Sequence, residues 1–221
     1  VDIARNFSGI LVGTGMYAFF DTRLFTLWGH RWRIGLLVLT TLVLVASLTP
    51  LLSTALAYQQ RDQAFPLISD FQSGWARKFI SPEQAHLTQV FAPGGSAPAK
   101  KPPVTQMELK PGTYPGISIA EPYPDWAAYK ELLLELHSPE AEAFDLVIRI
   151  HDCRHNHDFH DRFNRVLTVI PGNNRYQIAL SDIEHAPQTR LMNMKCISGV
   201  MLFVSGLEKP LKVHPGVMWL E

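Results

Sequence analysis

Residues Gly35 to Ala57 read GLLVLTTLVLVASLTPLLSTALA, a run of 23 residues without a charged side chain. At about 1.5 Å of rise per residue, a helix over this run can cross a hydrocarbon core of roughly 30 Å. Buried helices of soluble proteins are usually shorter and keep a polar face, whereas only Thr and Ser bring polar groups into this one. The run therefore predicts a membrane span, in which Pro50 is expected to kink the helix rather than end it.

The charges on either side of this span predict its orientation. Three arginines and one aspartate precede it in the segment 21–34, whereas one arginine and one aspartate follow it in the segment 58–62. Segments rich in Lys and Arg usually stay in the cytoplasm. We therefore expect everything after Ala57 to lie outside the cytoplasm, in a periplasm or at a cell surface.

A second apolar stretch precedes the span. Residues 3–20, IARNFSGILVGTGMYAFF, contain three glycines that would let helices approach closely in lipid. Spans over about 3–20 and 35–57 predict a transmembrane hairpin in residues 1–57. The expected partners are the lipid bilayer and other membrane proteins. Because the chain begins with Val and lacks a signal peptide, it is expected to be the tail of a longer protein.

Residues 58–103 combine several kinds of sequence. A polar stretch leaves the span, and PLISDFQSGWARKF (66–79) is a candidate first strand. VFAPGGSAPAKKPPV (90–104) is rich in Pro and Gly, which is typical of a surface loop. We therefore assign 58–103 to a stalk, a first strand and a loop, with residue 66 as an alternative start of the outer domain.

The remainder, 104–221, predicts an all-β domain. Short runs with a two-residue period alternate with Pro-Gly and Asn-Asn breaks, and any helices here are expected to be short. About eight strands with this spacing fit a β-sandwich of the jelly-roll type. The expected fold class is thus a membrane α-helical hairpin followed by an all-β sandwich. The strand candidates are 104–109, 116–120, 130–138, 145–152, 165–170, 175–180, 198–205 and 217–221.

The stretch HDCRHNHDFHDRFN (151–164) is the densest group of polar side chains in the chain. A metal site would use imidazole and carboxylate groups, but the spacing matches no closed zinc motif, so we assign no metal and no cofactor. A catalytic carboxylate pair is a second possibility, although no two carboxylates evidently converge. The weak metal candidates are His151, His155, His157 and His160.

Two further interpretations of this stretch stay open. Asp161, Arg162 and Asn164 are expected to tie a long strand connection to its neighbours through hydrogen bonds, which is the favoured interpretation. The loop could also face a ligand, with an aromatic platform beside it, because sugar rings present apolar faces and hydroxyl groups. The candidate ligand-binding residues are Arg149, Asp152, Asn156, Trp126 and Tyr129, of which Trp126 fits a core position better.

Charge and cysteine content limit the function classes. The 20 basic and 20 acidic residues balance, so no basic surface indicates a nucleic-acid partner. Cys153 and Cys196 would share an oxidising compartment outside the membrane, and whether they pair is left open.

The N-terminal run VDIARNFSGILVG (1–13) resembles the last motif of VanZ-like membrane proteins, which are bundles of bacterial inner-membrane helices. The resemblance covers about 15 residues and implies that further helices precede it. It places the chain in the bacterial inner (cytoplasmic) membrane, with the C-terminal domain in the periplasm or outside. No activity is carried over to any residue.

The C-terminal part contains DWAAYKELLLELHS (125–138), the run from Asp145 to Pro187 and TRLMNMKCISGVMLFV (189–204). In this order they resemble the galactose-binding-like sandwiches of carbohydrate-binding modules. Such domains often have an Asp before the last strand, where this chain reads HPGVMWLE (214–221). The resemblance implies a jelly-roll fold and a saccharide as a ligand.

We therefore expect a non-catalytic, membrane-anchored module that holds an envelope saccharide or a glycan-bearing partner. The alternative is a structural accessory subunit that packs its helices on a larger membrane complex and caps it on the periplasmic side. An enzyme acting on envelope lipid or glycan ranks third. An exposed aromatic ring with polar neighbours in a groove would favour the first function, and a large apolar patch on the sandwich would favour the second.

Overall fold

A computed structural model describes residues 2–20, 30–90 and 103–221. The chain forms two compact units, Val1–Leu56 and Ala57–Glu221. Two of the sequence predictions lie outside the described residues and side chains. They concern the arginines at 23, 31 and 33 and most of the loop expected at 90–104.

The first unit is a pair of helices. α1 spans Asp2–Phe20, and α2 spans His30–Ala64 and continues through Pro50. The two helices touch, because a Cβ atom added at Gly15 would lie 2.2 Å from Oγ1 of Thr40. Within the described residues, Ile34–Ala64 is the one helix that is long and apolar enough to cross a membrane.

Five Ser and Thr hydroxyl groups of α2 find their hydrogen-bond acceptors within the helix. Each donates to a backbone carbonyl three or four residues earlier, which an apolar environment requires of a polar side chain. The neighbouring Leu and Val side chains are exposed, as in Leu42, Leu51 and Leu52. The donors are Thr40, Ser47, Thr49, Ser53 and Thr54.

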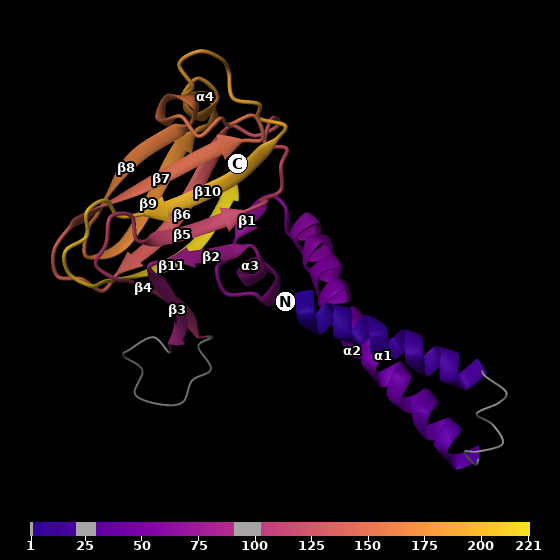
Figure 1. Cartoon of the computed structure of the whole chain (residues 1–221). Helices are drawn as coiled ribbons and strands as arrows, with labels where there is room; N and C mark the ends of the chain where they lie inside the picture. The colour runs from indigo at the N-terminus through magenta and orange to yellow at the C-terminus, as the bar shows by residue number, and fades with distance from the viewer. Residues whose placement is uncertain (1, 21–29, 91–102) are drawn as a thin grey trace. The chain divides into compact units, whose positions relative to one another are not determined.

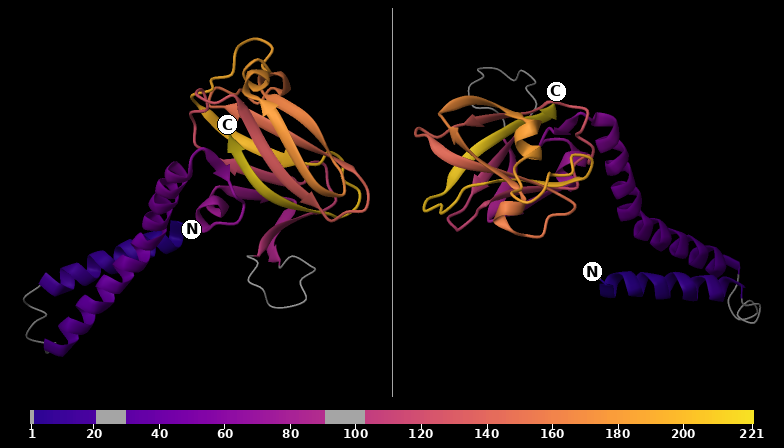
Figure 2. Two further views of the ribbon diagram at one scale, coloured as in Figure 1. Left: turned by 180° about the vertical axis from the view of Figure 1, so that it is seen from behind. Right: turned by 90° about the horizontal axis from the view of Figure 1, so that it is seen from above.

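The second unit is an all-β sandwich of two antiparallel sheets in a jelly-roll arrangement (Figures 1 and 2). The larger sheet has the order β3 (Ala85–Val90), β4 (Val104–Leu109), β11 (Leu211–Leu220), β6 (Glu131–Ser138) and β9 (Gly172–Ala179), with β1 (Leu67–Ser69) beside β11. The smaller sheet has the order β2 (Ile80–Glu83), β5 (Gly116–Ala120), β10 (Ile197–Phe203), β7 (Phe144–Asp152) and β8 (Phe163–Val169).

The alternating pattern of the strands builds the core. In β7, Leu146, Ile148 and Ile150 are fully buried, whereas Val147 and Arg149 face outward and are partly exposed. β4 alternates in the same way, whereas β6 buries three leucines in a row at 132–134. The inner faces of both sheets meet in one apolar layer. β7 therefore has a core face and a polar face.

The helices of the sandwich are short, as expected, and they sit in the connections. They are α3 (Gly74–Lys78), the 3-10 turn η1 (Phe159–Asp161) and α4 (Leu180–Glu184). The last turns of α2 also belong to this unit, because Phe65 stacks on Tyr123 with ring centroids 4.0 Å apart and Arg61 donates to the carbonyl of Glu121.

The strands differ from the sequence prediction in three main places. The candidate first strand at 66–79 contains only the three-residue β1, which is followed by α3. β4 and β5 begin and end as predicted, but β2 and β3 were not predicted at all. Their segment contains Pro82, and its exposed side chains carry little hydrophobic alternation. β11 begins six residues earlier than expected: its first half also alternates between buried and more exposed positions, but its register shifts between Pro215 and Met218, so the two halves do not form one continuous pattern.

Candidate functional site

The outer face of the smaller sheet holds a groove whose floor consists of two cross-strand rows. In the first row Arg149 of β7 lies between Asn164 of β8 and Met201 of β10. In the second row, two residues further along each strand, Val147 lies between Val166 and Phe203. Residues two apart on a strand share a face, so these six side chains all point to the same side.

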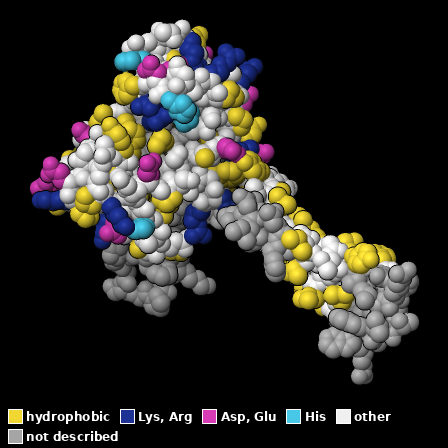
Figure 3. All heavy atoms as spheres, viewed as in Figure 1, with side chains coloured by type: hydrophobic (Ala, Val, Ile, Leu, Met, Phe, Trp, Pro, Cys, Tyr) yellow, Lys and Arg dark blue, Asp and Glu magenta, His cyan; other side chains and the backbone are white. Residues whose placement is uncertain are grey.

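Aromatic rings border the floor of this groove. Tyr114 precedes β5 and packs edge-on against Phe203, with ring centroids 5.7 Å apart. Phe159 belongs to η1, and the guanidinium of Arg162 lies 5.1 Å from its ring centroid. Tyr114 and Phe159 are each 58% exposed. The groove has a volume of about 650 Å³, and Lys and Arg side chains lie beside hydrophobic ones on this face (Figure 3).

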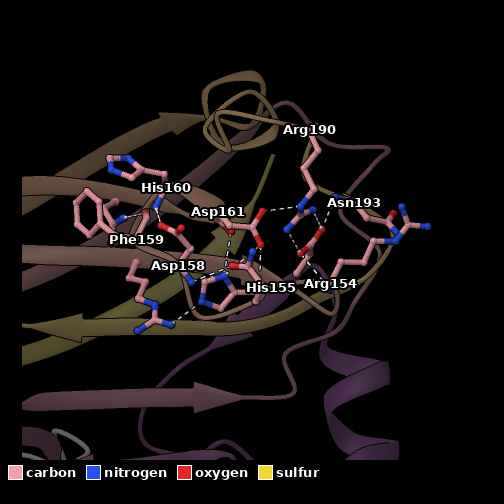
Figure 4. Close-up of polar contacts among 12 residues, drawn as sticks. Arg154, His155, Asp158, Phe159, His160, Asp161, Arg190 and Asn193 are labelled. Carbon is pink, nitrogen blue, oxygen red and sulfur yellow. Dashed lines mark hydrogen bonds and ion pairs between the residues drawn. The ribbon is translucent and has the colours of Figure 1, made fainter.

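The loop between β7 and β8 carries η1, and a buried ion-pair network holds it in place (Figure 4). Arg190, from the segment between α4 and β10, donates to both carboxylate oxygens of Asp152 at 2.6 and 2.8 Å. Its Nε donates to Asp161 at 2.6 Å. Backbone amides of Asn193 and Asn156 donate to the same two carboxylates. The loop is therefore fixed to the segment that precedes β10.

These contacts shift the ionisation of the three groups. Burial alone would raise the pKa of Asp152, but hydrogen bonds from Arg190 and from the Asn193 amide outweigh it and lower the pKa. The hydrogen bond from Arg190 likewise lowers the pKa of Asp161 despite its burial. The two carboxylates together raise the pKa of Arg190. The network is therefore an ionised cluster with matched partners.

His155 connects this network to the groove. One guanidinium nitrogen of Arg149 lies 3.0 Å from Nε2 of His155, and Nδ1 of His155 lies 3.0 Å from the carbonyl oxygen of Asp161. Because a guanidinium can only donate, Nε2 must accept and Nδ1 must carry the proton. His155 thereby sets the position of the Arg149 side chain.

His151 lies beside this contact and is held uncharged. Burial, the charge of Arg149 and the neighbouring His155 lower the pKa of His151 from 6.5 to about 4, against a smaller opposing effect of Asp152. Its ring covers Gly199 of β10, where an added Cβ would lie 2.5 Å from the ring atom Cε1. Gly199 is therefore the residue that leaves room for the imidazole.

A disulfide links the end of β7 to the segment before β10. Cys153, directly after β7, is bonded to Cys196, directly before β10, with a Cα–Cα distance of 5.7 Å. The sequence left this pairing open. The bond joins the same two segments as the Arg190 network.

The predicted ligand-binding residues do not form one site in the structure. Arg149 lies in the groove, but Asp152 is only 1% exposed and bonded to Arg190, so it cannot face a ligand as expected. Trp126 is fully buried, in agreement with the core position that we preferred. Tyr129 packs edge-on against Phe65 and lines a separate depression. Asn156 is exposed in the loop, and its side chain accepts from the amide of Asp158.

The three residues that were predicted to be structural differ in their roles. Asp161 has the expected role, because it anchors the loop to Arg190. Asn164 shares this role, because its Nδ2 donates to the carbonyl of Phe159 in the loop at 3.4 Å, and it also lines the groove. Arg162 lines the groove instead. Sequence reasoning missed Arg190, whose only signal was its place in the TRLMNM run, and it missed the aromatic residues Tyr114 and Phe159.

The histidines do not assemble a metal site. His151 and His155 have ring centroids 5.0 Å apart, and both ring nitrogens of His155 already have partners. No group of three or more His, Cys, Asp or Glu side chains in the described part of the chain could hold a metal ion.

A second groove of about 710 Å³ lies on the larger sheet. His137 and His214 stack there with ring centroids 5.6 Å apart, and His137 also contacts the amide oxygen of Asn173 at 2.9 Å. Its described lining includes no Trp, Tyr or Phe. Of the two faces, the smaller sheet is thus the one that combines a groove with aromatic rings.

No protein-family model matches the sequence, and no curated protein matches it. Solved structures match its fold. The family 11 carbohydrate-binding module from Clostridium thermocellum, in complex with a β-1,3-1,4-mixed-linked tetrasaccharide, aligns with a TM-score of 0.51 and 14% identity. The alignment covers 70% of this chain and 93% of that module. This chain shares the fold of that module.

Two agarases also contain this fold. An exo-β-agarase aligns with a TM-score of 0.52 and 12% identity, over 70% of this chain and 25% of that chain. A second agarase aligns with a TM-score of 0.52 and 13% identity, over 70% of this chain and 26% of that chain. The chain thus spans about a quarter of each agarase.

Proposed function

We propose that the chain is a non-catalytic saccharide-binding module that is tethered to a membrane by its apolar helices. One observation carries the proposal: in the groove on the smaller sheet, the exposed rings of Tyr114 and Phe159 lie beside the polar side chains of Arg149 and Asn164. This was the feature expected to favour saccharide over protein as the ligand.

The chemistry of sugars explains why this combination matters. A pyranose ring has apolar C–H faces that pack on aromatic rings, and its hydroxyls need planar donors and acceptors at fixed positions. Asn164 offers both an acceptor and a donor, and Arg149 offers donors. The two cross-strand rows hold these groups on strands, which position them more rigidly than a loop would.

A binding role fits the groove better than catalysis. Glycoside hydrolysis generally requires a pair of carboxyl groups that flank the scissile bond. Among the described lining residues the groove has one, Glu83. The shared fold with a carbohydrate-binding module agrees with this role, although a fold alone can host many functions.

The membrane tether rests on α2. Its uncharged run contains many exposed Leu and Val side chains, whose contact with water would be unfavourable. The Cys153–Cys196 bond is typical of a domain in an oxidising compartment, which agrees with a sandwich outside the cytoplasm. The VanZ-like resemblance of the first 13 residues stays a hypothesis for the identity of the hairpin.

The helix pair is also compatible with the alternative function, an accessory subunit of a larger membrane complex. Gly15 lets α1 approach Thr40 of α2. Apolar side chains of both helices are exposed, as in Ile10, Leu42 and Leu51. Such surfaces can be covered by lipid or by further helices. In this alternative the groove would bind no saccharide.

The test is binding of the full chain in lipid nanodiscs to a panel of polysaccharides, measured by retardation in affinity electrophoresis. Tyr114→Ala and Phe159→Ala should each weaken binding about three- to ten-fold, because one aromatic contact contributes about 0.5–1.5 kcal/mol. Trp219→Ala is the matched control, since it removes a ring from the larger sheet. Wild-type retardation by both groove variants would contradict the proposal, and so would a loss confined to Trp219→Ala.

A further inference from the structure

We propose that the groove on the smaller sheet selects saccharides that carry carboxylate groups, as uronic acids do. This rests on the proposed function and narrows it to one substrate class. The inference comes from the charges of the groove rather than from its aromatic rings.

Positive charge dominates the lining of the groove. Arg149, Arg162 and Arg165 lie along it, against the single carboxylate of Glu83. Arg165 is paired with Asp182 at 2.6 Å, so its charge is compensated. In the described part of the chain, Arg149 and Arg162 form no ion pair with a carboxylate.

The neighbouring carboxylates already interact with other groups. Asp152 and Asp161 both bind Arg190. Asp158, on the same loop, accepts a hydrogen bond from the amide of His160, and its charge partly offsets that of Arg162. The positive charge of Arg149 is therefore not cancelled by the acids beside it.

The side chains themselves also leave polar groups unused. The Nε atoms of Arg149 and Arg162 and the Oδ1 atom of Asn164 are buried without a hydrogen-bond partner. Burial lowers the pKa of both arginines, and the charge of Arg162 lowers that of Arg149 further. Two desolvated cations that repel each other are a costly arrangement, which an anion bound between them would relieve.

The geometry suits a carboxylate in particular. A guanidinium presents parallel N–H groups that match the two oxygens of a carboxylate. His155 fixes the Arg149 side chain before any ligand arrives, because it accepts from one of its nitrogens. The Arg162 guanidinium lies over the Phe159 ring, 5.1 Å from its centroid. Both arginines are thus pre-positioned, which reduces the entropy lost on binding.

The test compares three tetrasaccharides on the full chain in nanodiscs by isothermal titration calorimetry. The probes are tetragalacturonate, its fully methyl-esterified form, and a neutral β-1,3-1,4-linked glucose tetrasaccharide. The ester keeps the shape of the acid but removes its charge. We expect the acid to bind at least about ten-fold more tightly than its ester. The preference should weaken between about 20 and about 200 mM NaCl, because salt screens charge pairs.

Variants locate the effect. Arg162→Gln should remove the preference for the acid over the ester by lowering the affinity for the acid. Arg149→Gln should also remove this preference, and it should weaken binding of the ester as well, because Arg149 offers donors to the sugar hydroxyls. Arg175→Gln is the matched control, because it removes one positive charge from the larger sheet, where Arg175 lies over Trp219. Arg162→Lys keeps the charge without the planar fork and should retain part of the preference. Near-UV circular dichroism checks that each variant is folded.

The outcomes separate this inference from the proposed function. Equal affinity for acid and ester, with loss of binding in Tyr114→Ala, would overturn the charge selectivity and leave the saccharide-binding groove standing. A preference for the acid that survives in both groove variants but disappears in Arg175→Gln would overturn the location. No binding of any of the three probes would count against both proposals.

Discussion

Arg190 donates two parallel hydrogen bonds, of 2.6 and 2.8 Å, to the carboxylate of Asp152. The two residues are 38 positions apart in the chain. Asp152 ends β7, and Arg190 lies in the segment that leads to β10. Both flank the loop that places Phe159 and Arg162 on the groove. The stability of this pair and the shape of the groove are therefore linked.

Arg190→Met should destabilise the sandwich by about 3–5 kcal/mol, because the substitution leaves two buried carboxylates with backbone amide donors but no positively charged partner. Urea unfolding of the full chain in detergent, followed by near-UV circular dichroism, measures this loss. Arg165→Met is the matched control: it breaks the exposed pair with Asp182 and should cost no more than about 1 kcal/mol. If both variants lost the same free energy of unfolding, the buried network would contribute no more to stability than the exposed pair.

His151 should make stability depend on pH between 4 and 6.5. Its pKa falls from 6.5 to about 4 in the folded state, so the unfolded chain binds the proton first. The stability from an uncharged His151 is complete above pH 6.5 and is lost as the pH falls to 4, by at most about 3 kcal/mol. Burial is the main cause of this lowered pKa; the charged or titratable neighbours Arg149, His155 and Arg162 lower the pKa further, and Asp152 opposes them.

His151→Gln should flatten that part of the pH profile, which urea unfolding at a series of pH values would reveal. His160→Gln, which replaces an exposed histidine of the same loop, should leave the profile unchanged. A wild-type slope in His151→Gln would exclude His151 as its source.

The disulfide should contribute about 2–4 kcal/mol to the free energy of unfolding, since it closes a loop between residues 43 positions apart. The Cys153→Ser/Cys196→Ser variant and the reduced wild type should unfold at the same, lower urea concentration. If the reducing agent leaves the wild-type midpoint unchanged, the bond does not form in solution.

Gly199→Ala should cost about 1–3 kcal/mol, because its Cβ would lie 2.5 Å from the His151 ring and overpack the site. It should also weaken saccharide binding, since His151 lies against Arg149. In a His151→Ala background the same substitution should cost less than about 0.5 kcal/mol. An unchanged cost there would mean that the clash is not with His151.

The sequence was sufficient for features that local pattern determines. The uncharged run 35–57 predicts a long helix, and the alternation of β7 places Ile148 in the core and Arg149 on the surface. β2 and β3 were missed because their exposed side chains carry no such alternation. Their place in the sheets depends on pairing with distant strands.

The site was harder to predict because it depends on register and on long-range contacts. Asn164 faces the groove only because it lies opposite Arg149 in the β7–β8 pair. Asp152 is buried because Arg190, far along the chain, neutralises it. Neither relationship can be read from the neighbouring residues. Trp126 was the exception, since its place in an apolar strand entry already favoured the core.

The most direct test of the groove is hydrogen–deuterium exchange of the full chain in nanodiscs, with and without whichever of the three tetrasaccharides binds most tightly. The account predicts slower exchange in the ligand-bound form at segments 112–116 and 159–166, which carry Tyr114, Phe159 and Asn164. Segments 135–138 and 173–177 on the larger sheet should be unaffected. Protection confined to the larger sheet, or none at all under saturating saccharide, would contradict it.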